Sequence, residues 1–89
     1  MELKRVGSEH LKLETEKLSA QIGLLIKQAR KSRGVTQEKL AEAADISEKY
    51  LSSVENGKES NISMGYILAI ALALDISLLK LLPTSAHEN

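Results

Sequence analysis

The sequence contains no cysteine. Disulfide bonds, a thiolate nucleophile and cysteine-based metal sites are therefore excluded. The two histidines, His10 and His87, belong to no cluster of metal-ligand residues, and we expect both to be solvated near the chain ends. We expect no cofactor and no metal.

Phenylalanine and tryptophan are also absent, and so is the alternation of β-branched residues that is typical of strands. These absences predict an all-α chain. The longest apolar run, residues 64–74, is too short to span a bilayer, and no apolar segment follows the charges at the N-terminus. We therefore expect a soluble cytoplasmic protein without a membrane partner.

A surplus of charge of one sign is missing, because 12 basic residues balance 12 acidic ones. Non-specific polyanion binders usually carry a basic excess, so the balance argues against that class. The charge is unevenly placed, since residues 27–58 hold seven basic and five acidic side chains. No acid/base pair, nucleophile–base set or phosphate-binding glycine loop is present, so we do not expect an enzyme.

What the sequence does contain is a series of helix start and stop signals. The first helix follows Ser8 and ends before Gly34; it is long, and Ser19 or Gly23 could divide it. Serine and threonine N-caps predict four more helices, at residues 37–44, 48–55 and 64–74 and between Ser77 and Pro83; the caps are Thr36, Ser47, Ser63 and Ser77.

Two of these helices, residues 37–44 and 48–55, are short and joined by a very short turn. In such a pair the helices cross at a steep angle, and the second projects its exposed face past the first. A helix presented in this way has about the width that the major groove of B-DNA accepts. The arrangement predicts a DNA-binding function.

The residues around this turn resemble the Cro/C1-repressor-type (XRE-like) helix-turn-helix regulators. The match consists of T-Q-x-x-L-A from Thr36 and I-S-x-x-Y-L-x-x-V-E-x-G from Ile46, within residues 22–82. The loop spacing is most similar to that of SinR-type regulators, although Ile62 stands where those often have proline. The resemblance implies a five-helix lambda-repressor-like domain that binds specific double-stranded DNA sequences as a homodimer.

The resemblance also implies roles for individual residues. Arg30 and Glu55 correspond to the family's ion pair, and Gln37 to a glutamine that contacts phosphate and bridges neighbouring contacts. Base-reading positions fall on Glu48, Lys49 and Ser53, with Ser52 on the same exposed face. Candidate phosphate contacts flank the groove: Ser47, Tyr50, Asn56, Lys58 and Asn61.

Glu48 has an alternative role. A carboxylate weakens generic DNA binding but can accept a hydrogen bond from cytosine N4 and so favour one base. It can equally serve only the helix N-terminus, where negative charge is worth about 0.3–1 kcal/mol.

The helix at residues 64–74 is apolar nearly all round. One stripe should cover the domain core: Met64, Ile67, Ile70, Ala71 and Leu74. Leu68 and Leu72 then need another cover, which is either a second subunit, together with Leu79 and Leu82, or the N-terminal segment folded back. We favour the dimer.

The predicted organisation is an N-terminal extension at residues 1–20, helical in part, a helix-turn-helix domain at residues 21–83 and a tail at residues 84–89. We expect a transcriptional repressor of the kind found in phages or restriction–modification control. The alternatives are an antitoxin that binds a toxin through residues 1–19 or 86–89, and a protein-interaction module that kept the fold.

Overall fold

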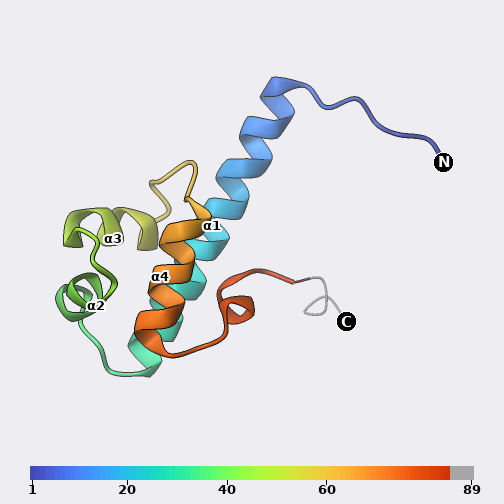
Figure 1. Ribbon diagram of the computed structural model, residues 1–89. Helices are drawn as coiled ribbons and strands as arrows, with labels where there is room; N and C mark the ends of the chain where they lie inside the picture. Colours follow the sequence, from blue (N-terminus) through green and yellow to red (C-terminus); the bar gives the residue numbers. More distant parts are fainter. Residues whose placement is uncertain (85–89) are drawn as a thin grey trace.

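The computed structural model describes residues 1–84, which form four α-helices and one 3₁₀-helix (Figure 1). They are α1 (Ser8–Ser32), α2 (Gln37–Ala44), α3 (Glu48–Glu55), α4 (Met64–Leu74) and η1 (Leu78–Leu81). No strand occurs within this part of the chain, and none of its helices is both long and apolar enough to cross a membrane. The expected all-α fold class is confirmed. Apart from Thr84, the predicted C-terminal tail lies outside the described residues, as do His87 and residues 86–89.

The short last helix predicted between Ser77 and Pro83 is present, as a 3₁₀-helix of four residues rather than an α-helix. The proline at position 83 forces Leu82 into an extended conformation, with φ −111° and ψ 134°. Only residues 78–81 lie between Ser77 and the extended Leu82, and they do not form the four-residue bonds of an α-helix. The backbone instead makes bonds over three residues, such as Lys80 N to Ser77 O at 3.0 Å.

Three predicted N-caps close their helices with side-chain hydrogen bonds. The hydroxyl oxygens of Thr36, Ser47 and Ser63 accept from the backbone N–H three residues later, at 3.0–3.2 Å. Ser8 does not cap α1 but is its first helical residue, and Gly7 occupies the cap position without a side-chain bond. Each such cap stabilises its helix by about 1 kcal/mol, so α2, α3 and α4 begin directly after the predicted cap residues.

The sequence D-I-S occurs twice and makes the same turn each time. Asp45 and Asp75 are left-handed, with φ 58° and 56°. The isoleucine after each aspartate donates its N–H to the carbonyl five residues back, at 3.0 Å in both cases, which is the Schellman bond at a helix C-terminus. The serine then caps the next element, Ser47 for α3 and Ser77 for η1. One three-residue motif therefore ends α2 and α4 and starts their successors.

Helix α1 is continuous over 25 residues, and neither Ser19 nor Gly23 divides it. Both residues lie on its buried face. The Ser19 hydroxyl donates to the Ser60 carbonyl at 3.2 Å. A methyl group at Gly23 would overlap the carbonyl oxygen of Val54, so the glycine allows the backbones of α1 and α3 to approach closely.

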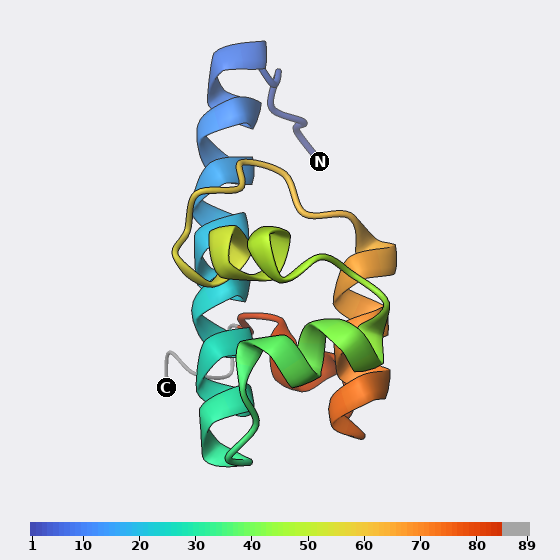
Figure 2. The ribbon, with the colours of Figure 1, turned by 90° about the vertical axis from the view of Figure 1, so that its left-hand side faces the viewer.

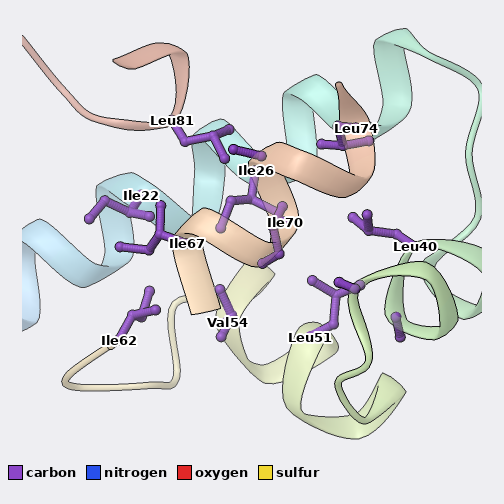
Figure 3. Packing of buried hydrophobic residues seen from close by; sticks show 13 residues of the cluster. Ile22, Ile26, Leu40, Leu51, Val54, Ile62, Ile67, Ile70, Leu74 and Leu81 are labelled. Carbon is purple, nitrogen blue, oxygen red and sulfur yellow. The ribbon is translucent and has the colours of Figure 1, made fainter. Parts of the chain in front are cut away.

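The core lies between α1, α4 and the pair α2 and α3, and η1 closes one end of it (Figures 2 and 3). In Figure 2, α2 and α3 lie across one face of the layer formed by α1 and α4. The largest fully buried side chains come from all five elements: Ile26, Leu40, Leu51, Val54, Ile70 and Leu81. The N-terminal half of α1 projects beyond this core (Figure 1), and the molecule is 46 Å long in its longest dimension.

The predicted core stripe of α4 is right except at its first residue. Ile67, Ile70, Ala71 and Leu74 are buried, whereas Met64 is 64% exposed. Met64 stands at the start of α4, and Ile62 from the preceding loop is buried in the core cluster instead.

Candidate nucleic-acid interface

The turn between α2 and α3 consists of residues 45–47 and leaves one face of α3 free. Leu51 and Val54 hold the inward face of α3 in the core, and Leu40 and Ala41 do the same for α2. Ile46, in the turn itself, is half-buried against both. The two helices are therefore fixed to each other through apolar contacts, and the side of α3 opposite Leu51 is left to polar residues.

The outward face of α3 carries the predicted base readers. Glu48, Lys49 and Asn56 are exposed, whereas Ser52 and Ser53 are half-buried. Helical spacing places Lys49, Ser53 and Asn56 on one side of the helix. Glu48 lies in the first turn, where its charge also complements the helix N-terminus. Both roles considered for Glu48 are compatible with this position.

The two serines on this face are already engaged. Asn56 Nδ2 lies 3.4 Å from Ser52 Oγ, a long hydrogen bond. The Ser53 hydroxyl donates to Glu59 Oε2 at 2.9 Å. Glu59 was not among the predicted site residues, since it lies in an irregular loop where no periodicity links it to α3.

Arg30, Glu55 and Gln37 form one buried network behind α3. The Arg30 guanidinium makes a bidentate pair with the Glu55 carboxylate, with Nε to Oε2 at 2.7 Å and Nη2 to Oε1 at 2.9 Å. Arg30 Nη1 also donates to the Val35 carbonyl at 2.7 Å, and Gln37 Nε2 to Glu55 Oε1 at 2.9 Å. These bonds join the end of α1, the start of α2 and the end of α3.

The electrostatics of this network keep the guanidinium charged. The hydrogen bonds that Arg30 donates to Glu55, and the negative charge of Glu55, raise the pKa of Arg30 above its ordinary value, against the opposing effect of burial. No buried side-chain nitrogen or oxygen in the described part of the chain lacks a hydrogen-bond partner. The pair therefore acts as a satisfied, rigid joint that sets the angle of α3.

Tyr50 turns away from the outward face of α3. Its ring lies 4.3 Å from that of Tyr66 on α4, centroid to centroid, at an interplanar angle of 34°. Burial raises the pKa of Tyr50, and the charge of Glu59 and the proximity of Tyr66 raise it further. Of the other predicted phosphate contacts, Ser47 is exposed and caps α3, and three lie exposed at the end of α3 and in the loop that follows: Asn56, Lys58 and Asn61.

The predicted dimer-interface residues lie on α4, on η1 and directly after η1. Leu68, Leu72 and Leu79 are exposed, Leu72 at 71%, whereas Leu82 is half-buried against the core. The N-terminal segment does not cover them, because α1 runs straight and its first half projects into solvent (Figure 1). Among residues 1–84 no group of acidic residues and histidines is arranged to hold a metal ion.

Two short helices joined by a three-residue turn, the second of them with a free polar face, define the helix-turn-helix class of DNA-binding domains. A family model described as "Helix-turn-helix" matches residues 26–81. The chain belongs to this family, in its Cro/C1-repressor (XRE) type of DNA-binding transcriptional regulators. This membership supports a regulator rather than an enzyme.

Two curated proteins show the relationship in sequence. The HTH-type transcriptional regulator SinR of Bacillus subtilis is 39% identical over 68 residues, which cover 76% of this chain and 60% of SinR. The ImmF control region 10 kDa protein of Bacillus phage phi105 is 38% identical over 70 residues, covering 76% of this chain and 77% of the phage protein. The chain thus spans about 60% of the length of SinR.

Two solved structures show the relationship in the fold. The restriction-modification controller protein C.AhdI of Aeromonas hydrophila matches with a TM-score of 0.67 at 33% identity, over 71% of this chain and 94% of that one. SinR in complex with DNA, described as the master regulator for biofilm formation, matches with a TM-score of 0.64 at 38% identity, over 67% of this chain and 95% of that one.

Proposed function

We propose that the protein is a transcriptional repressor that binds double-stranded DNA as a homodimer, with α3 of each subunit in the major groove. The observation that carries the proposal is the buried network of Arg30, Glu55 and Gln37, which fixes the angle of α3 while its outward polar face stays free. The similarity to SinR, which has been solved in complex with DNA, supports the same use of the fold.

In this arrangement Lys49 contacts bases, and residues at the end of α3 contact the phosphate backbone of the DNA. The exposed ammonium of Lys49 can donate to guanine O6 or N7. Three exposed residues would contact the phosphates of one DNA strand: Asn56, Lys58 and Asn61. At the start of α2, beside Gln37, the free backbone N–H groups of the helix favour a further phosphate.

Exposed apolar surface and the balance of charge support the homodimer. Leu68 and Leu72 on α4 and Leu79 on η1 are exposed, and in Figure 1 η1 lies on the side of α4 opposite α2 and α3. With a net charge of zero, a single subunit has little electrostatic affinity for DNA. Two subunits joined through these leucines would read two half-sites about one helical turn apart.

Selection of bound DNA from random oligonucleotides tests the DNA-binding part. We expect an enriched sequence with two-fold symmetry. Lys49→Ala should lower the binding free energy for this sequence by about 1–3 kcal/mol and reduce the base preference at one position of each half-site. Lys12→Ala is the matched control, because Lys12 is also an exposed lysine and belongs to the N-terminal half of α1, which projects beyond the core. If no sequence is enriched even at low salt, the chain is a protein-interaction module instead.

Sedimentation tests the dimer. Leu72→Glu should shift the protein toward the monomer and weaken binding to the selected DNA, because a charge cannot be buried there without a partner. Leu13→Glu is the control, since Leu13 is 57% exposed on the projecting half of α1. An unchanged mass for Leu72→Glu would contradict the interface.

A further inference from the structure

A loop carboxylate fixes one hydroxyl on the outward face of α3. Ser53 Oγ lies 2.9 Å from Glu59 Oε2, and both side chains are half-buried. The backbone holds the loop in place, because Gly57 takes φ +71° and Lys58 N donates to the Ser53 carbonyl at 2.9 Å. The loop thus turns back onto the last turn of α3 and keeps Glu59 beside Ser53.

The chemistry of the two groups sets the direction of this hydrogen bond. A serine hydroxyl has one proton to donate and two lone pairs that accept, whereas an ionised carboxylate only accepts. The shared proton therefore comes from Ser53. With that proton committed to Glu59, the Ser53 oxygen has only lone pairs left for a third group.

We propose that Glu59 makes Ser53 a one-way reader, which accepts hydrogen bonds from bases and cannot donate to them. In the major groove only adenine, through N6, and cytosine, through N4, offer an N–H donor. Guanine O6 and N7 and thymine O4 are acceptors and would face the serine lone pairs without a proton between them. A free serine hydroxyl serves either kind of base, so the selectivity originates in Glu59.

This inference rests on the proposed function, since it requires α3 to lie in the major groove. Glu59 is a positioning residue in it, because it acts through Ser53. Its charge does act on α3, since it contributes, after burial, to the raised pKa of Tyr50.

The test compares base preferences in selections from random oligonucleotides for the wild type and three variants: Glu59→Ala, Ser53→Ala and the double variant. For the wild type we expect about a five-fold preference for adenine or cytosine at one position, the size of a single hydrogen bond of about 1 kcal/mol. In Glu59→Ala the preference for adenine or cytosine over guanine or thymine at that position should fall to about two-fold or less, since the hydroxyl proton is then free. Ser53→Ala should abolish the preference, and the double variant should behave as Ser53→Ala alone.

Glu38→Ala is the matched control for loss of charge. Glu38 is an exposed carboxylate in the first turn of α2, near the same groove, and makes no hydrogen bond or ion pair within the described residues. Its removal should raise affinity for all sequences equally and leave the base preference unchanged. Circular dichroism melting of each variant verifies that it is folded.

Two results would overturn the inference while the proposed function stood. One is DNA binding in which Glu59→Ala keeps the wild-type preference at every position. The other is a preference that survives in Ser53→Ala, which would mean that Glu59 contacts the base directly. Failure of the wild type to select any sequence would instead overturn the proposed function.

Discussion

Removal of the Glu55 carboxylate should be among the most damaging single changes in this domain. The Glu55 side chain is fully buried and accepts three hydrogen bonds, two from Arg30 and one from Gln37. In Glu55→Ala, Arg30 keeps only its bond to the Val35 carbonyl, and a buried positive charge loses its counter-ion. Breaking a buried pair from one side costs about 3–5 kcal/mol.

Proton loss cannot relieve this cost. An arginine side chain stays protonated at any ordinary pH, and in the native protein the bonds with Glu55 raise the pKa of Arg30 further. A domain of this kind is stable by about 5–15 kcal/mol, so Glu55→Ala should remove a large share of the total.

The double variant Arg30→Met/Glu55→Leu distinguishes the effect of an unpaired buried charge from the effect of losing the ion pair. It replaces both charges by apolar groups of comparable size, a change that is often neutral or even stabilising. We expect it to be clearly more stable than Glu55→Ala. DNA affinity should still fall, because the bidentate geometry that sets the angle of α3 is gone.

Urea denaturation followed by circular dichroism measures the free energy of unfolding, at one fixed protein concentration because a dimer gains stability with concentration. A loss of less than about 1 kcal/mol in Glu55→Ala would refute the reasoning, since that is the scale of an exposed ion pair. So would a double variant that is as unstable as the single one.

Two further predictions concern packing and pH. Gly23→Ala should destabilise by about 1–3 kcal/mol, because its methyl group meets the Val54 carbonyl. In the same denaturation assay Gly65→Ala should be neutral or stabilising by up to about 1 kcal/mol, because its methyl group would meet only Ser63 Oγ, at an ordinary contact distance of 4.0 Å. The raised pKa of Tyr50 means that the folded state prefers the neutral phenol, so stability is constant below the ordinary value of 10.0 and falls as the pH rises through the higher folded value. In Tyr66→Phe, where Tyr50 is the remaining tyrosine, tyrosinate absorbance should reach its midpoint above pH 10.0; a midpoint at or below that pH would contradict the burial.

Local signals determined most of the fold. The caps at Thr36, Ser47 and Ser63 predicted where α2, α3 and α4 begin, because each is a short-range bond between a side chain and the backbone. The prediction failed where tertiary context decided. Met64 fits the apolar stripe by spacing but stands at the start of α4 and is exposed. Pro83, a local signal, did end the short last helix as predicted, although that helix is 3₁₀ rather than α.

The site shows the same division. Helical spacing located the outward face of α3, and the resemblance to the family located Arg30 and Glu55, which the structure joins. Sequence could not reveal that Glu59 binds Ser53, since the contact depends on how an irregular loop folds back after Gly57. It also could not show that Tyr50 packs against Tyr66 on another helix.

The charges around α3 favour discrimination over affinity. Lys49 follows Glu48 on α3, and Glu59 lies beside Ser53 on the same helix; each carboxylate repels the phosphate backbone whatever its sequence. The same groups favour bases that offer an N–H donor, so they lower the affinity for non-specific DNA more than the affinity for the specific site. In the function proposed above, a single subunit would bind weakly, and affinity would come from a second copy that engages a neighbouring half-site. The exposed leucines of α4 and η1 would then contribute to DNA recognition through the dimer.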